Sequence, residues 1–380
     1  VVVGEEREGL AAESKVRMCG FPTGVDDGTY ANGILQGLNA KGWVEIHHKG
    51  DNLVEQGFSG TAVWAVAENA VCGMTVSVLN RRNAVVAYMI PANVLITAFP
   101  EMEKLSRPAN PYLGLEAFKE KDAKLYFGRK ETVARMQQTA EEQDVVAVIG
   151  ASGSGKSSLV LAGVIPALRR TGNWLIADCR PKKQPLYELA ASLVPLLYDD
   201  ELELIKRTRQ CAADFRKGDL PLSDLIRRIV EKNGAQRFLL VVDQFEELYT
   251  LNQDSEARCF IDLLLSAGET EVLSAVITMR ADFLETALQY NVFAEALNKA
   301  SIIVPPISEH GLRQAVEQPA ELFKVGFVSG LVDLIIRDVG QEPGNLPLLE
   351  FCLTQLWERQ EFRRISHDAY TAIGGVQQAL

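Results

Sequence analysis

The spacing of apolar and polar residues changes near residue 110 and divides the chain into two differently built parts. Before that point, short apolar runs alternate with Gly, Pro and Asn, a spacing typical of an all-β sandwich or barrel. One helix is expected to close this part, over residues 91–99. The predicted strands are 15–20, 42–47, 62–66, 71–78 and 84–89.

From Tyr112 onward, continuous apolar runs alternate with stretches of helical period. Strands separated by helices in this way predict a parallel sheet that is covered on both faces. After Ser308 the pattern is helical. The predicted strands are 145–149, 174–177, 238–242, 272–279 and 302–304; the helices include 186–197, 222–231 and 257–265, then 309–318, 330–339 and 346–360.

A glycine-rich loop follows the first of these strands. It has the form G-x-x-x-x-G-K-S and leads into an apolar run that can form a helix, which is the context of a phosphate-binding P-loop. Glycines let the backbone amides curl around a phosphate, and the helix start adds free amides. Lys156 would reach the β- and γ-phosphates, while the Ser157 hydroxyl would bind Mg²⁺. The candidate phosphate-binding residues are Gly150, Ser152, Gly153, Ser154, Gly155, Lys156, Ser157 and Ser158.

The apolar run 237–242 ends in Asp243, which is the form of a Walker B strand. Asp243 would hold Mg²⁺ directly or through a water. Glu246 and Glu247 place two more carboxylates just beyond the strand, at the edge where open α/β sheets bind ligands. One of them would polarise the attacking water, and the sequence does not rank the two. Together the two motifs predict binding of ATP or ADP with Mg²⁺ and a catalysed hydrolysis.

Composition and charge limit the kinds of partner, membrane association and cellular compartment that we expect for the chain. The chain has 380 residues, a net charge of −11 and ordinary globular proportions of 47% hydrophobic and 23% charged residues. The acidic balance disfavours nonspecific nucleic-acid binding. No apolar stretch approaches the roughly 20 residues that span a bilayer, and the six cysteines form no C-x-x-C pair. We therefore expect no membrane association, no zinc or disulfide framework, and a reducing cytoplasm. Because residue 1 is Val, we expect a piece of a longer protein.

Several further motifs, in order, resemble those of the bacterial STAND signalling ATPases, in the novel STAND group. The segment from Asn110 to Glu131 is similar to the part of that group that lines the adenine side of the pocket, which implies roles for Phe127, Gly128 and Arg129. Asp178-Cys-Arg-Pro is similar to the group's Arg-Pro signature. Arg280, in T-M-R-A-D-F, is placed as a γ-phosphate sensor, and Pro347, in G-N-L-P, is placed against the base.

The resemblance implies an AAA+-related sheet followed by a helical domain. It also implies a switch that is compact and ADP-bound when off, and ATP-bound and self-oligomeric when on. The resemblance does not identify the trigger that turns the switch on. It implies that a C-terminal sensor, which is not in this chain, recognises that trigger. The resulting domain boundaries are 1–105 for the β-rich domain, 106–111 for a linker, 112–307 for the P-loop NTPase, 308–365 for the helical domain and 366–380 for the start of a winged helix.

The β-rich part resembles the second barrel of trypsin-like serine peptidases. The loop Glu55-Gln-Gly-Phe-Ser-Gly is similar to their nucleophile loop, although Phe58 stands where many members have Asp. By this resemblance Ser59 is the nucleophile, and the amides of Gly57 and Ser59 form the oxyanion hole. The family's His and Asp belong to a first barrel that is absent here. His47 and His48 are expected to be strand-end residues rather than a general base.

These features together predict an α/β P-loop NTPase preceded by a trypsin-like barrel. The expected function is an ATP-dependent STAND switch that activates a serine-protease effector against a protein substrate, in bacterial anti-phage defence. Two alternatives stay open: an AAA+-type motor that feeds substrates to the peptidase, and a nucleotide-gated scaffold with an inactive protease-like module.

Overall fold

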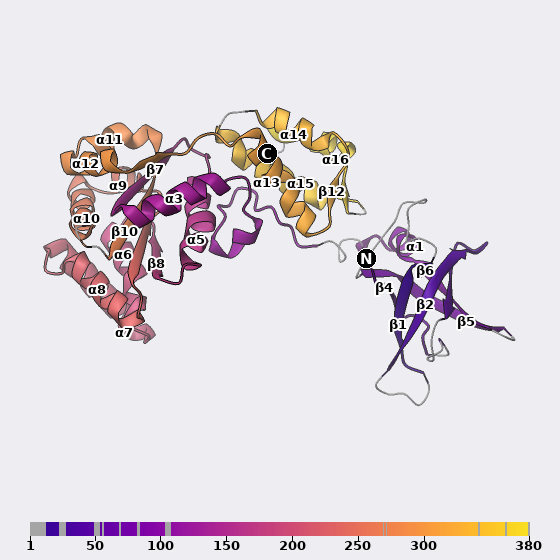
Figure 1. Cartoon of the computed structure of the whole chain (residues 1–380). Helices are drawn as coiled ribbons and strands as arrows, with labels where there is room; N and C mark the ends of the chain where they lie inside the picture. Colours follow the sequence, from indigo (N-terminus) through magenta and orange to yellow (C-terminus); the bar gives the residue numbers. More distant parts are fainter. Residues whose placement is uncertain are drawn as a thin grey trace. The chain divides into compact units, whose positions relative to one another are not determined.

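The computed structural model separates the chain into two compact units, one of residues 1–109 with 360–364 and one of 110–359 with 365–380 (Figure 1). It describes residues 13–22, 28–48, 54, 57–67, 70–81, 84–102, 108–268, 270, 272–340, 343–361 and 363–378. Of the predicted linker 106–111, residues 106 and 107 lie outside this range. No helix within the described residues has both the length and the apolar character needed to cross a membrane.

The first unit contains a closed antiparallel barrel (Figure 1). Its strands pair in the order β1-β2-β3-β6-β5-β4, and β4 returns to β1. Helix α1 (Ala92–Ala98) follows the last strand. The barrel strands are β1 (Lys15–Gly20), β2 (Thr29–Leu38), β3 (Val44–His48), β4 (Ala62–Ala65), β5 (Ala70–Arg81) and β6 (Ala84–Pro91).

The barrel interior is filled by alternating side chains. In β1, Val16 and Met18 are buried while their neighbours face outward, the two-residue period of a half-buried strand. Strand β2 was not expected from the sequence. Gly33, in its middle, lies so close to β3 that a Cβ there would stand 2.4 Å from Ile46 Cγ2. The glycine interrupts the apolar pattern because the close strand contact requires it.

The second unit is built on a five-stranded parallel sheet in the order β11-β7-β10-β9-β8. All five strands predicted from the sequence are present, with ends that differ by up to two residues. They are β7 (Val145–Gly150), β8 (Trp174–Cys179), β9 (Arg237–Val242), β10 (Leu273–Arg280) and β11 (Ser301–Ile303). The P-loop strand β7 and the Walker B strand β9 flank β10, so their carboxyl ends meet at one edge.

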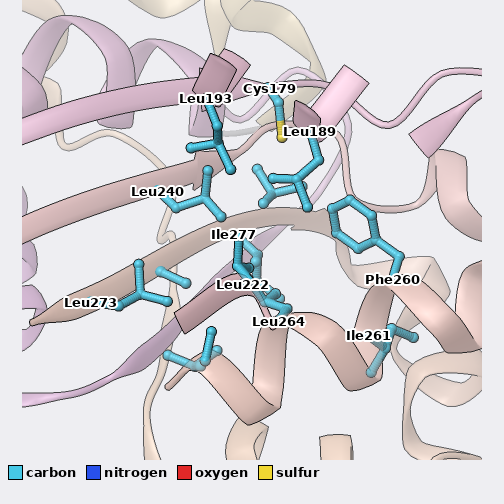
Figure 2. Packing of buried hydrophobic residues seen from close by; sticks show 14 of the residues in the cluster. Cys179, Leu189, Leu193, Leu222, Leu240, Phe260, Ile261, Leu264, Leu273 and Ile277 are labelled. Atoms are coloured by element: carbon cyan, nitrogen blue, oxygen red, sulfur yellow. The ribbon is translucent and has the colours of Figure 1, made fainter. Parts of the chain in front are cut away.

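Helices cover both faces of this sheet. One face packs on α6, α7, α8 and α10, in the cluster that Figure 2 shows around Leu240 and Ile277. The other face packs on α3 and on the helix after the P-loop. The helices are α3 (Lys130–Glu142), α6 (Pro185–Leu193), α7 (Glu201–Lys217), α8 (Leu222–Asn233), α9 (Glu247–Leu251), α10 (Asp254–Ala267), α11 (Leu284–Leu288) and α12 (Asn291–Lys299).

The helix after the P-loop is continuous but irregular. It starts as α4 (Lys156–Ser158), widens to a π-helical segment over Leu159–Val164 and ends as α5 (Ile165–Arg169). Short helical turns of 3-10 type occur elsewhere in the chain, and π segments are frequent at functional sites. The 3-10 turns are Glu120–Leu125, Val194–Leu196, Ala281–Phe283 and Pro343–Asn345.

The chain after residue 308 forms a helical region with its own core. Trp357 is buried at its centre and makes an edge-on contact with Tyr112, with the ring centroids 5.8 Å apart. The segment before α3 is thereby attached to the helical region. The elements are α13 (Glu309–Leu322), α14 (Leu331–Val339), α15 (Leu346–Glu358), α16 (His367–Ala372) and α17 (Gly375–Gln378), with the short strands β12 (Gly326–Phe327) and β13 (Arg364–Ile365).

Candidate nucleotide-binding site

The loop after β7 has the backbone of an anion cradle. Gly153 and Gly155 have φ values of +71° and +83°, a region that other residues rarely adopt. The Lys156 side chain folds back along the loop and is only 8% exposed. Its Nζ donates to the carbonyl oxygens of Gly150, at 3.1 Å, and Ala151, at 2.8 Å. The ammonium group is therefore held over the loop, where a phosphate would lie.

Burial lowers the pKa of Lys156, and the nearby Glu246 carboxylate opposes that shift. Desolvation disfavours the charged form of a lysine. A phosphate beside Nζ would favour the charged form, and so the site gains stabilisation when an anion occupies it.

Ser157 and Asp243 come together, as the two motifs predict. The Ser157 Oγ donates a hydrogen bond to Asp243 Oδ1 over 2.7 Å. Both are hard oxygen ligands of the kind that Mg²⁺ prefers, and the rest of its shell is commonly water and phosphate. The donor set therefore fits Mg²⁺, held by a hydroxyl from the P-loop and a carboxylate from the end of β9.

Thr278 in β10 fixes this carboxylate, a role that none of the sequence motifs indicates. Its Oγ1 donates to Asp243 Oδ1 at 2.6 Å and accepts from the Gln244 amide at 2.9 Å. Gln244 has a φ of +56°, so the backbone turns sharply immediately after the acid. Thr278 is 1% exposed, and its buried hydroxyl therefore holds both the Asp243 carboxylate and the Gln244 amide in place.

Replacing Thr278 with valine should destabilise the fold by about 1–3 kcal/mol, because it leaves buried polar partners unsatisfied at nearly constant volume. Urea unfolding of the two proteins measures the change. Thr278→Ser keeps the hydroxyl and should retain most of the stability. Equal stability of the valine variant and the original protein would show that the hydroxyl is unimportant.

The structure separates Glu246 from Glu247. Glu247 is 8% exposed and is bound by Arg180, whose Nε lies 2.8 Å from Glu247 Oε1, and by the Lys182 amide at 3.1 Å. Glu246 instead lines the cavity next to the P-loop, and its Oε2 accepts from the Arg280 amide at 3.3 Å. Glu247 is thus an anchor between β8 and α9, and Glu246 is the carboxylate that faces the cavity.

Arg280 reaches the same cavity from the end of β10. Its guanidinium is paired with Asp282 through two hydrogen bonds, of 3.0 and 2.6 Å. The side-chain hydrogen bond raises the pKa of Arg280 and lowers that of Asp282. Both side chains are solvent-accessible, so the pair is weak. A γ-phosphate in the cavity would compete with Asp282 for this guanidinium.

The cavity has a volume of about 420 Å³, within the range of small-molecule sites. Part of the lining is polar and consists of the P-loop with Gln244, Glu246, Thr278 and Arg280. The rest of the lining is mainly apolar, as suits a nucleotide base. It includes Leu115, Phe118, Leu125, Phe127, Ile307, Ala315, Leu346, Pro347 and Leu349.

The residues before α3 hold the P-loop and the helical region together. Arg129 is buried and donates to Ser154 O, at 3.1 Å, and to Pro305 O, at 2.7 Å. At Gly128 the backbone touches the start of α13, since a Cβ would lie 2.3 Å from Gly311 O. Gly128 and Arg129 therefore position the site, while Phe127 lines the cavity itself.

Three other predicted residues have defined surroundings at the loop. Ser152 lines the cavity and is exposed. The Ser158 Oγ accepts a hydrogen bond from the Phe118 amide at 3.1 Å, which ties the helix start to the segment before α3. Pro347 borders Gly153, because a Cβ on that glycine would stand 3.3 Å from its ring.

The barrel places Ser59 in a turn outside the core. Phe58, the preceding residue, is fully buried, and Gly57 has a φ of +110°. Ser59 is exposed, and its Oγ donates to Val76 O at 3.0 Å, next to a register shift in β5. His47 lies on β3 beside Glu45, with 3.6 Å between Nε2 and Oε2. The described residues contain no hydrogen bond between His47 and Ser59.

Several solved protein structures resemble part of this chain in overall fold, but their sequences differ strongly from it. A Walker-type ATPase of Pyrococcus abyssi is 13% identical, with a TM-score of 0.45; the match covers 70% of this chain and 74% of that one. The Aeropyrum pernix ORC1 protein, solved in complex with DNA, is 17% identical with a TM-score of 0.44, over 65% of each chain. Cdc6p from Pyrobaculum aerophilum is 12% identical with a TM-score of 0.41, over 65% of this chain and 63% of that one.

A comparison with curated proteins found no match. The model of the family described as Novel STAND NTPase 1 matches residues 111–380. That span includes the P-loop, Asp243, Glu246, Arg280 and the helical region, and it is well over half of the chain. The chain therefore belongs to the novel STAND NTPase 1 family.

Proposed function

We propose that the chain is an ATP-dependent STAND switch that binds ATP with Mg²⁺, hydrolyses it and assembles with other copies when a trigger is present. The observation that carries the proposal is the convergence of Lys156, the Ser157–Asp243 pair and Glu246 on one cavity. Family membership supports the NTPase part. The trigger would be read by a C-terminal sensor outside this chain.

Each side chain has a distinct task in this reading. The P-loop amides and Lys156 bind the β- and γ-phosphates. Ser157 and Asp243 would hold Mg²⁺, which neutralises phosphate charge when bound. Glu246 orients the water that attacks the γ-phosphorus and accepts its proton. Arg280 leaves Asp282 for the γ-phosphate and thereby distinguishes ATP from ADP.

We further propose that the barrel belongs to a trypsin-like peptidase effector that acts on a protein substrate. Support comes from the closed six-stranded antiparallel barrel and from the turn that carries Gly57 and Ser59. In this reading Ser59 is the nucleophile and depends on a His and an Asp supplied by a preceding barrel. Cleavage would be switched on by assembly, with anti-phage defence as the biological setting.

Ser59→Ala should abolish peptide cleavage and labelling by a serine-directed fluorophosphonate, while ATP affinity should stay unchanged. The measurement uses the natural protein with ATP and trigger, and mass spectrometry locates the labelled residue. Thr61→Ser, in the same turn, is a matched control that should keep the label on Ser59. Labelling at another residue, or none in protein that has assembled, would exclude a peptidase.

A nucleotide-gated scaffold with an inactive barrel is the second candidate. The observation in its favour is the hydrogen bond from Ser59 Oγ to Val76 O, because a hydroxyl with this partner acts as a turn stabiliser. The fluorophosphonate experiment separates the two candidates. A motor that feeds substrates to the peptidase would instead consume many ATP molecules for each cleavage, which a parallel assay of phosphate and peptide release measures.

A further inference from the structure

Gln244, the residue after the Walker B acid, has an unusual backbone and no task in the proposed function. Five non-glycine residues in the described part of the chain have a positive φ, and of these only Gln244 lines the cavity. Its φ of +56° lies in the left-handed region, which glycine and asparagine adopt with less strain than glutamine. Strained residues cluster at functional sites, and so the glutamine at this position needs an explanation.

Hydrogen bonds of the backbone explain the turn at Gln244 but not its side chain. The backbone N–H of Gln244 donates to Thr278 Oγ1 at 2.9 Å, and its carbonyl accepts from the Glu247 amide at 3.0 Å. A glycine would form both bonds without the strain. The glutamine side chain is therefore not needed for the turn.

The side-chain amide of Gln244 is available to a ligand. It forms no hydrogen bond with any residue that the structure describes, and neither of its polar atoms is among the buried atoms that lack a partner. Gln244 is half-buried and lines the cavity. Its Oε1 and Nε2 atoms are thus both accessible and unpaired.

Glu246 lies on the same turn and lines the same cavity. Its Oε2 accepts from the Arg280 amide at 3.3 Å, while its Oε1 is accessible and has no hydrogen-bond partner among the described residues. Between the two polar residues, Phe245 is fully buried and stacks on Phe293, with the ring centroids 5.1 Å apart. The buried ring anchors the turn, and an amide and a carboxylate on either side of it border one cavity.

We propose that Gln244 and Glu246 together position the water that attacks the γ-phosphorus. The inference rests on the proposed ATP hydrolysis, in which Glu246 is the base. Glu246 accepts the water proton that is removed, and Gln244 Oε1 accepts a hydrogen bond from the other water proton. Two acceptors direct a lone pair of the water oxygen towards phosphorus. A neutral amide does so without adding a negative charge that would repel the γ-phosphate.

Gln244 is a positioning residue in this step and exchanges no proton. The water oxygen bonds to the γ-phosphorus while the bond from that phosphorus to the β–γ bridging oxygen breaks, and ADP leaves with the electron pair. One water proton passes to Glu246. The proton held by Gln244 stays on the oxygen and becomes part of the phosphate product. Losing the amide should therefore slow the chemical step and leave ATP binding nearly unchanged.

A glycine variant separates positioning from a structural role. Gln244→Gly keeps the turn and relieves its strain, so the melting temperature should not fall appreciably. Single-turnover phosphate release should become about 10- to 100-fold slower, because the water is less well oriented. The calorimetric dissociation constant for ATP should change by less than about threefold. Gln244→Asn also tolerates the turn but reaches less far, and it should show the same loss.

Lys324→Gly is the matched control for the glycine variant. Lys324 has a φ of +57°, is exposed in the turn after α13 and does not line the cavity. The substitution relieves the same kind of strain, and it should leave the rate of hydrolysis unchanged.

A double variant tests whether the two side chains act on one water. Residues that act as a unit have non-additive effects on rate. Gln244→Gly combined with Glu246→Gln should therefore hydrolyse ATP about as slowly as Glu246→Gln alone. Rate losses that multiply would show that the two residues act separately and would overturn the proposal.

Two further results would overturn it. If folded Gln244→Gly hydrolyses ATP at the original rate, Gln244 is a turn residue only. If excess Mg²⁺ restores the rate of the variant, the amide holds the metal and not the water. Failure of the proposed function has a different signature, because the unchanged chain would then hydrolyse no ATP, or Glu246→Gln would hydrolyse it at the full rate.

Discussion

Lys156→Ala should abolish measurable ATP binding. The side chain is 8% exposed and its Nζ lies over the loop carbonyls, so a bound phosphate would meet this ammonium in a desolvated site. Removing one partner of a buried charge pair costs about 2–5 kcal/mol. We expect the dissociation constant to rise roughly 100-fold or more.

Calorimetry with ATP and Mg²⁺ measures this effect directly. Lys217→Ala is a matched control, because Lys217 is an exposed lysine at the end of α7 that does not line the cavity. It should bind ATP as the unchanged chain does. An alanine variant at position 156 with unaltered affinity would remove the basis of the nucleotide assignment.

Glu246→Gln should slow ATP hydrolysis about 100-fold or more and leave ATP affinity nearly unchanged. The expected loss follows from removing a general base, which typically contributes 10²–10⁴-fold. The neutral amide still fits the space and still accepts from the Arg280 amide. Phosphate release under single-turnover conditions measures the chemical step. The variant should also accumulate as the ATP-bound assembly if hydrolysis resets the switch.

Glu247→Gln is the contrasting variant, because the neighbouring acid has a structural partner instead of a substrate-facing position. Loss of its charge weakens the contacts with Arg180 and the Lys182 amide. Arg180 is partly exposed, so we expect only about 1–2 kcal/mol of lost stability. The folded fraction should still hydrolyse ATP. If the two variants exchanged these phenotypes, Glu247 would be the base.

The parts of the fold that follow from local periodicity were predictable. The buried parallel strands are continuous apolar runs, and the P-loop has a fixed spacing of glycines before Lys156. Strand β2 (Thr29–Leu38) was missed because Asn32, Gly33 and Gly37 interrupt its alternation. Helix α7 (Glu201–Lys217) is not among the helices named from the sequence; its surface is highly charged and its buried residues lie mainly in its second half.

The site was less predictable wherever a role depends on a partner distant in the sequence. Nothing local distinguishes Glu246 from Glu247, and the distinction comes from Arg180, 67 residues away from Glu247. The hydroxyl of Thr278 has its role through Asp243, 35 residues away. Predicting these roles requires knowledge of the packing of β8 and β10.

The contact between Gly128 and Gly311 links the P-loop to helix α13. The two backbones are in direct contact at these glycines, so there is no side chain between them that could rearrange if α13 moved. The next residue, Arg129, donates a hydrogen bond to the P-loop carbonyl of Ser154. Helix α13 and the P-loop are thus connected through two adjacent residues, Gly128 and Arg129. A rotation of the helical region that moved α13 would therefore displace Gly128 and, through Arg129, the P-loop carbonyl of Ser154.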